Sequence, residues 1–281
     1  MSDGKSAARK FRLLNQRQRW EVADELRTAN LHSANARQSL VVPTRSFYVR
    51  HGKRWLDVAI SAVALVVTLP INAVVFAASA ATVGPPVIFR QRRLGKDGKE
   101  FTMLKPRTMR DEFDEEGRPL PGEQRLTQVG RLIRKTSMDE LLNFWSILKG
   151  DMSVIGPRPL VPEYADRYSK RHAQRMAVRP GLNFPPHDAE ASVEDYQGQF
   201  ENDVWYVSHV SLTNDLKALL GTVSEMLNRR KSSIRAASGR GSFMGYGADG
   251  RVITSPNVPE WAVDRVLARH GLLPVGDGMV R

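Results

Sequence analysis

Two adjacent carboxylates and an arginine-bearing turn are the most informative part of this sequence. The carboxylates are Asp139 and Glu140, and the turn, residues 156–159, holds Arg158 between two prolines. A carboxylate can act as a nucleophile or bind a metal ion, and a guanidinium can bind phosphate oxygens through two parallel hydrogen bonds. Together these side chains are the parts that a phosphoryl-transfer site requires.

The same residues also have a purely structural interpretation. Ser137 and Glu140 have the spacing of a capping box, in which two side chains satisfy backbone N–H groups at the start of a helix. Asp139 would be favoured near a helix N-terminus by the helix dipole alone. These residues by themselves favour the structural role, and the rest of the chain shifts the balance toward catalysis.

Composition and charge narrow the class of protein. The 281 residues could form one large or two small domains, and the absence of cysteine excludes a disulfide framework and a thiolate metal site. The net charge of +12 is unevenly distributed. Residues 1–110 hold 20 basic and 7 acidic residues, whereas residues 111–281 hold 22 basic and 23 acidic residues. A basic chain suggests nucleic-acid binding. No zinc finger, RNP motif or aromatic-interleaved basic ribbon is found, so nucleic acid is not an expected partner. The six histidines show no metal-ligand spacing.

The basic half contains one long apolar segment, from Val58 to Val83, with no charged residue. It is long enough for a transmembrane helix, but basic residues flank both ends, which the positive-inside rule places in the cytoplasm. Pro70 should kink or break the helix near its middle, and each arm of roughly 18–20 Å is shorter than the ~30 Å hydrocarbon core. We predict a re-entrant membrane helix hairpin; an ordinary kinked span and a buried core helix are the alternatives.

The remaining patterns predict an α+β fold that is mainly helical. Val87 to Phe89 and Phe101 to Leu104 flank a Gly-rich turn and predict a small β hairpin. Helices are expected over 132–148 in two pieces, 164–176, 212–227 and 260–270. Residues 11–31 are predicted to form either a helix or a disordered segment. If they are helical, they would lie on a membrane surface or pack on a partner. The expected divisions are a basic N-terminal arm (1–46), a membrane-associated re-entrant segment (47–86), a compact cytoplasmic catalytic domain (87–230) and a loose C-terminal tail of unassigned role (231–281).

Residues 52–230 resemble the catalytic domain of the bacterial sugar transferases, the monotopic polyprenyl-phosphate phosphoglycosyl transferases. No single motif is specific, but their ordered combination is. In chain order, the matching stretches are Lys53 to Asp57, Val87 to Gly95, Lys105 to Met109, Leu126 to Ser137, the Asp139–Glu140 pair, Lys149 to Pro159 and Asp203 to Lys217.

The resemblance implies a reaction. The first carboxylate of the pair, Asp139, would attack the β-phosphate of a UDP-sugar and release UMP, and polyprenyl (undecaprenyl) phosphate would then take the phosphosugar from the enzyme. Glu140 would bind Mg²⁺, the expected cofactor. Such an enzyme would work on the cytoplasmic face of the bacterial inner membrane, among its lipids, and would initiate exopolysaccharide or other glycoconjugate synthesis. Assembly into a homo-oligomer is left open.

Four basic residues are expected to bind phosphates. Arg158, held between two prolines, is the strongest candidate, because arginine binds phosphate oxygens through two parallel hydrogen bonds. Arg134 matches the family arginine five residues before the nucleophile, and Lys105 and Arg107 match the family's Lys-x-Arg motif. The alternative for each residue is a solvated surface charge. The chain departs from the family at Pro106, where phenylalanine is usual, and at residues 182–188, where a run containing tryptophan is expected. Sugar specificity therefore cannot be transferred.

A competing hypothesis is a catalytically weakened relative that serves as a membrane scaffold in a polysaccharide assembly complex. The altered loop at 182–188 and the long C-terminal tail motivate it. The intact Asp139–Glu140 pair, Arg134 and Arg158 favour the enzyme instead.

Overall fold

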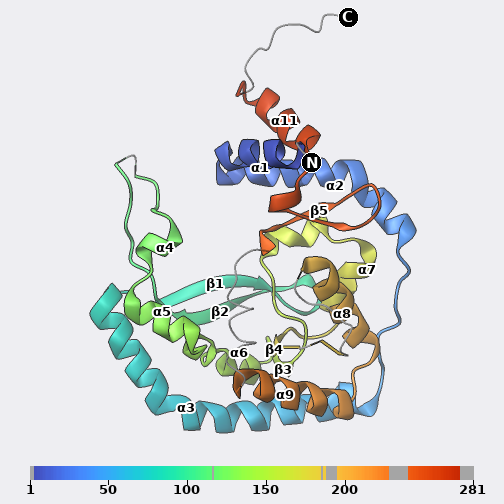
Figure 1. Ribbon diagram of the computed structural model, residues 1–281. Helices are drawn as coiled ribbons and strands as arrows, with labels where there is room; N and C mark the ends of the chain where they lie inside the picture. Colours follow the sequence, from blue (N-terminus) through green and yellow to red (C-terminus); the bar gives the residue numbers. More distant parts are fainter. Residues whose placement is uncertain (1–2, 116, 185, 188–194, 228–239, 273–281) are drawn as a thin grey trace, which may run out of the picture.

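The computed structural model describes residues 3–115, 117–184, 186–187, 195–227 and 240–272, and it confirms a mainly helical chain with small sheets (Figure 1). The helices are α1 (Asp3–Leu13), α2 (Gln16–Arg37), α3 (Lys53–Val83), α4 (Gly122–Arg125), α5 (Gln128–Lys135), α6 (Asn143–Lys149), α7 (Lys170–Ala173), α8 (Tyr196–Ser208), α9 (Leu212–Leu227) and α11 (Glu260–Arg269). The strands are β1 (Ile88–Leu94), β2 (Glu100–Pro106), β3 (Ser153–Ile155), β4 (Gly181–Asn183), β5 (Phe243–Tyr246) and β6 (Val252–Thr254).

The apolar segment forms most of α3, which contains Pro70 and bends along its length (Figure 1). A proline inside a helix removes a hydrogen bond and crowds the preceding turn, which accounts for a bend. The helix does not break, so the two arms meet at a wide angle, and a tight hairpin with antiparallel arms is not seen. By length and composition, Tyr48–Val83 could cross a membrane.

The outward face of α3 is apolar, and its inward face is largely polar. Its buried residues are Asp57, Ser61, Asn72, Val75 and Ser79, whereas Val66 and Val74 are about 70% exposed (74% and 69%). A helix in water normally buries its apolar stripe. This reversed arrangement leaves a large apolar surface without cover in the described structure.

Both ends of α3 are fastened to the same domain. At its start, Lys53 forms an ion pair with Asp215 of α9 (2.5 Å), and Arg54 donates to the backbone carbonyls of Ile147 and Leu148 (2.5 and 2.7 Å). At its end, the Arg107 guanidinium donates to the carbonyl of Val83 (2.9 Å), and the Ser79 hydroxyl donates to the carbonyl of Arg107. The two ends of the helix are therefore both held by the domain that follows it in the chain.

The predicted β hairpin is confirmed and is longer than expected. β1 and β2 are antiparallel, and Phe89 pairs with Lys105 and Ile88 with Pro106. Pro106 lies at the last position of β2, where the ladder does not need its missing N–H. The departure from the family at this position therefore leaves the strand, and the placement of Lys105, intact.

A short parallel pair, β3 and β4, supports the Gly156–Pro159 turn. Ser153 pairs with Gly181 and Ile155 with Asn183. A Cβ added to Gly181 would lie 2.2 Å from the backbone nitrogen of Gly156, and one added to Gly156 would lie 2.6 Å from the carbonyl oxygen of Arg179. Only glycine permits this close approach, so these two residues fix where the turn leaves the sheet.

One of the sequence predictions fails in this region. The expected helix over 164–176 is instead a 3-10 turn at Pro162–Arg167, the short α7 and another 3-10 turn at Gln174–Ala177. Tyr168 and Ser169 are extended, and the Ser169 hydroxyl caps α7 by accepting from the His172 N–H. Serine competes for backbone hydrogen bonds in this way and begins a new helix. The helices over 212–227 and 260–270 are found as α9 and α11.

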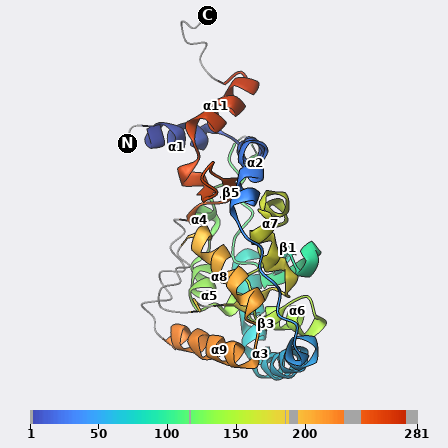
Figure 2. The ribbon, with the colours of Figure 1, turned by 90° about the vertical axis from the view of Figure 1, so that its right-hand side faces the viewer.

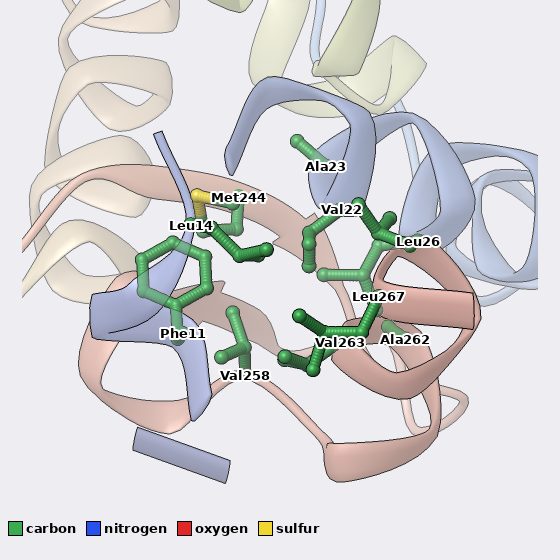
Figure 3. Close-up of a cluster of buried hydrophobic side chains, with 11 residues drawn as sticks. Phe11, Leu14, Val22, Ala23, Leu26, Met244, Val258, Ala262, Val263 and Leu267 are labelled. Carbon is green, nitrogen blue, oxygen red and sulfur yellow. The ribbon is translucent and has the colours of Figure 1, made fainter. Parts of the chain in front are cut away.

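The two ends of the chain form one module outside the region that resembles the sugar transferases. α1, α2 and α11 pack with β5 around a shared apolar core that contains Phe11, Leu14, Leu26, Met244 and Val263 (Figure 3). Lys10 forms ion pairs with Glu260 (2.6 Å) and Asp264 (2.7 Å) across the interface. The described part of the tail, residues 240–272, is therefore folded, which corrects the expectation of a loose tail; residues 231–239 and 273–281 lie outside the described residues.

The module lies at the opposite end of the molecule from α3 and α9 (Figures 1 and 2). It contacts the domain through Tyr246, whose hydroxyl lies 2.8 Å from Nδ1 of the buried His172 and accepts from the Ser169 N–H (3.0 Å). Residues 11–31 are thus helical, with a break at Asn15, which caps α2. They pack against the C-terminal segment and do not lie beside α3.

Candidate active site

A left-handed residue places the paired carboxylates. Ser137 has φ of 56° and turns the chain between α5 and a 3-10 turn, Met138–Glu140, that carries both acids. Its side chain makes no capping hydrogen bond, so the capping-box interpretation is wrong. The expected helix start at Asp139 is also corrected, because α6 begins only at Asn143. The two carboxylates are therefore free of capping roles.

The structure brings four of the predicted site residues together. Nζ of Lys105 lies 3.2 Å from Oδ2 of Asp139 and 3.4 Å from Oε1 of Glu140. Nη2 of Arg158 donates to the same Glu140 oxygen at 2.5 Å. Three of the side chains are mostly covered, with exposed fractions of 14% for Asp139, 17% for Lys105 and 25% for Glu140, and Arg158 is half exposed (52%). A compact cluster of two acids and two bases results.

Electrostatics keep this cluster charged. Burial would raise the pKa of Glu140, but the charges of Arg158 and Lys105, with their hydrogen bonds, outweigh burial and hold the pKa below the usual range. The charge of Glu140 raises the pKa of Arg158 in turn. Glu140 is therefore a carboxylate, and not a carboxylic acid, at any pH near neutrality.

A buried ion pair that the sequence did not reveal holds Arg158 in place. Arg175 donates through Nε and Nη2 to Oδ2 of Asp203 (2.9 and 2.7 Å), and Nη2 also donates to the backbone carbonyl of Arg158 (2.7 Å). Both side chains of the pair are almost fully buried. The turn is thus fixed by its prolines, by Gly181 beneath it and by Arg175 behind it.

A small pocket opens beside the cluster and contains residues that were not predicted. Leu182 belongs to the segment that departs from the family, and its carbonyl accepts from Nη1 of Arg158 (3.4 Å), so the altered loop borders the site. Asn143 is 1% exposed, and its Oδ1 has no hydrogen-bond partner in the described chain. The lining residues are Gln91, Arg93, Met103, Lys105, Glu140, Asn143, Met152, Arg158, Pro159, Gly181 and Leu182.

Two predicted phosphate-binding residues lie outside the four-residue cluster. Arg107 forms an ion pair with Asp111 (2.9 Å) and bonds to the end of α3. Arg134 donates from Nε to the hydroxyl of Thr108 (2.9 Å). The structure gives both a structural contact and does not place them at the carboxylates; phosphate binding by them stays a prediction.

The donor set suits Mg²⁺ bound together with substrate. No group of three or more His, Cys, Asp or Glu that could hold a metal is found among the described residues. Mg²⁺ commonly takes only one or two carboxylates and completes its shell with water and substrate phosphates. Asp139 and Glu140 supply two carboxylates, and the unpartnered Oδ1 of Asn143 lines the same pocket as Glu140. The residues present therefore fit such an ion.

Comparison with known proteins agrees with this geometry. Residues 48–229 match the family model described as "Bacterial sugar transferase". An uncharacterized sugar transferase, EpsL, of Bacillus subtilis is 46% identical over 145 residues, which cover 52% of this chain and 72% of that protein. A UDP-glucose:undecaprenyl-phosphate glucose-1-phosphate transferase of Caulobacter vibrioides is 35% identical over 185 residues, covering 62% and 69%. An undecaprenyl-phosphate galactose phosphotransferase of Salmonella typhimurium is 31% identical over 195 residues, covering 63% and 40%.

The chain belongs to the bacterial sugar transferase family. The matched region begins at the turn before α3 and ends beyond α9, so it contains the whole site. The module built from α1, α2 and α11 lies outside it.

Proposed function

We propose that this protein transfers a sugar 1-phosphate from a UDP-sugar to undecaprenyl phosphate, releases UMP, and so initiates the assembly of an exopolysaccharide or another glycoconjugate. The observation that carries the proposal is the joining of Asp139, Glu140, Lys105 and Arg158 in one cluster. The names of the Caulobacter vibrioides and Salmonella typhimurium relatives support the donor and acceptor classes.

In the first step, a carboxylate oxygen of Asp139 attacks the β-phosphorus. Lys105 is the only described residue that hydrogen-bonds this carboxylate, and it engages Oδ2, which leaves Oδ1 free to attack. The new bond joins Oδ1 to phosphorus, and the bond from phosphorus to the oxygen that bridges the two phosphates breaks, so UMP leaves with that oxygen. Lys105 and Arg158 stabilise the charge that develops on the phosphate oxygens.

In the second step, a phosphate oxygen of undecaprenyl phosphate attacks the same phosphorus. The bond to Asp139 breaks, the carboxylate is regenerated, and the product is an undecaprenyl diphosphate sugar. Mg²⁺, bound through Glu140, would supply positive charge to the diphosphate. Splitting the transfer lets a water-soluble donor and a lipid acceptor use one set of residues in turn.

The exposed face of α3 supports re-entrant insertion into the cytoplasmic leaflet of the inner membrane. An exposed apolar surface of this extent is unfavourable in water and suits a lipid environment. Because both ends of α3 are tied to one domain, a helix that crossed the bilayer would have to leave one of these attachments. The bend at Pro70 allows the middle of the helix to enter one leaflet while both ends stay at the cytoplasmic surface.

Two experiments test the proposal. In membranes supplied with Mg²⁺, undecaprenyl phosphate and a panel of UDP-sugars, the wild type should release UMP with at least one donor, and Asp139→Asn should release none while it stays folded. Full UMP release by Asp139→Asn would refute the covalent mechanism.

Topology is tested with single cysteines at Ser46 and Lys99, since the chain has none of its own. Both should resist a membrane-impermeant maleimide in intact cells and react after lysis. Labelling of only one of them from outside would show an ordinary span.

A further inference from the structure

One face of β1 presents an arginine to the active-site pocket. Side chains alternate along a strand, so Gln91 and Arg93 lie on one face and Arg92 on the other. Gln91 and Arg93 line the pocket with Lys105, Glu140 and Arg158. Arg92 points away and pairs with Glu100, its Nε lying 2.6 Å from Oε2.

Arg93 is the only one of these cations without an acidic partner. In the described part of the chain, no carboxylate lies within ion-pair distance of Arg93, and its side chain donates only a long hydrogen bond to the carbonyl of Arg92 (3.4 Å). Burial and then the positive charge of Arg158 lower the pKa of Arg93, and the charge of Glu163, which forms no ion pair with Arg93, partly opposes them. A partly buried arginine beside another arginine is unfavourable unless an anion joins them.

The charges of the other groups show why such an anion is needed. Asp139 and Glu140 carry two negative charges, and Lys105 and Arg158 carry two positive charges that already contact them. Without a bound metal ion, these four side chains are neutral as a whole and offer little attraction for a diphosphate. Arg93 is the positive charge left over at the pocket wall.

The position of Arg93 along the hairpin indicates which phosphate it meets. Lys105 pairs with Phe89, and Arg93 lies four residues further along β1, roughly 13 Å at 3.3 Å per residue. β1 begins shortly after α3 ends, so Arg93 is at the end of the hairpin that is farther from the C-terminal end of α3. The attacked phosphate must contact Asp139, beside Lys105, and a lipid acceptor would approach from α3.

We propose that Arg93 binds the donor phosphate attached to the nucleoside, the group that leaves as UMP, and so both recruits the donor and stabilises the leaving group. This assignment rests on the proposed function for the identity of the donor. A guanidinium can hold two oxygens of that phosphate at once and can neutralise the charge that it gains as the bridging bond breaks.

The test is direct binding of UMP, which carries only this phosphate. UMP affinity is measured by calorimetry on the full chain in detergent with Mg²⁺, for the wild type, Arg93→Gln, Arg93→Lys and the matched control Arg92→Gln. Loss of a charged hydrogen-bonding partner should weaken UMP binding about 10–100-fold in Arg93→Gln. Arg93→Lys should fall between, because charge is kept and the fork is lost, and Arg92→Gln should stay within about twofold. Thermal unfolding of each sample shows whether the variants are folded.

Several results would overturn the assignment. The first is that Arg93→Gln binds UMP within about threefold of the wild-type affinity. The second is that the wild type does not bind UMP. The third is that Arg93→Gln loses affinity for polyprenyl phosphate and keeps its affinity for UMP. The proposed function is judged separately by UMP release from UDP-sugars. If the wild type binds UMP through Arg93 but cleaves no UDP-sugar, the assignment stands and the proposed function fails. If the wild type cleaves a UDP-sugar and Arg93→Gln does so with an unchanged donor KM, the assignment fails and the proposed function stands.

Discussion

Replacing Arg175 with methionine should destabilise the protein and disturb the site at a distance. Arg175 and Asp203 are 2% and 3% exposed, and Arg175 supplies both hydrogen bonds that Asp203 receives from described residues, together with one to the carbonyl of Arg158. Removing one partner of a buried ion pair costs about 3–5 kcal/mol, because the other charge is left buried and unpaired. For a domain of this size, that loss corresponds to a fall in Tm of roughly 6–20 °C.

The pH dependence of this variant separates an unpaired charge from a simple packing defect. Burial raises the pKa of Asp203 even beside Arg175, and without Arg175 the charge and the hydrogen bonds that mainly oppose burial are lost. A carboxyl whose folded pKa is raised destabilises the fold increasingly as pH rises from the unfolded pKa through the folded one. The deficit of Arg175→Met relative to the wild type should therefore be smaller at pH 5.5 than at pH 8. Adding Asp203→Asn should remove this difference.

The assay is thermal unfolding of the full chain in detergent at both pH values, followed by UMP release. The double variant Arg175→Met with Asp203→Leu should recover much of the stability, since an apolar pair can replace a buried ion pair. Its activity should stay low, because the carbonyl of Arg158 has lost its donor. A deficit below about 1 kcal/mol, or one that does not change with pH, would refute the reasoning; recovery of both stability and activity would show that Arg175 does not position Arg158.

Three further predictions follow. Glu140→Gln should need more Mg²⁺ for half-maximal UMP release than the wild type. If the two proteins gave the same Mg²⁺ titration curve, Glu140 would not be a metal ligand. Arg158→Lys should lower catalytic efficiency at least about tenfold, because a lysine cannot form the two parallel hydrogen bonds of a guanidinium. Near-native kinetics of this variant would show that Arg158 acts only as a surface charge. Burial would raise the pKa of Glu201, but its hydrogen bonds to His172 and Arg171 and their charges lower the pKa to about 2. Glu201 therefore contributes stability above its unfolded pKa, and this stability is lost as pH falls toward 2. Glu201→Gln should therefore lose less of its free energy of unfolding over that range, by about 1 kcal/mol at most since the side chain is 37% exposed, and this is measured as a smaller fall in Tm.

The sequence predicted the local elements that short-range patterns encode. The hairpin, the division of the 132–148 helix into two pieces and the helix over 212–227 were all visible, because turn residues and apolar periodicity act over a few positions. The family resemblance named Lys105, Arg158 and the two acids as site residues, and the structure places them together; their roles stay predictions.

The contacts made across long distances in the sequence were not predictable. Nothing near Arg175 shows that it reaches Asp203 and the Arg158 carbonyl, because a buried charge pair has no local pattern. Arg92 and Arg93 look equivalent in the sequence, and only the pairing of β1 with β2 decides which one faces the pocket. The C-terminal segment was mistaken for a loose tail because its apolar residues find their partners in α1 and α2, more than 200 residues earlier.

The module shared by the two chain ends has a consequence for biogenesis. α1 and α2 are synthesised before the residues that complete their core, which lie more than 200 residues later in the chain (Figure 3). Until residues 240–272 are synthesised, the apolar side chains of these helices lack the partners that cover them in the folded module. Pairing of such distant segments is slow, and unpartnered apolar surface invites aggregation or chaperone binding in the meantime. Truncation after residue 230 would make that temporary state permanent while every residue of the catalytic cluster is still present.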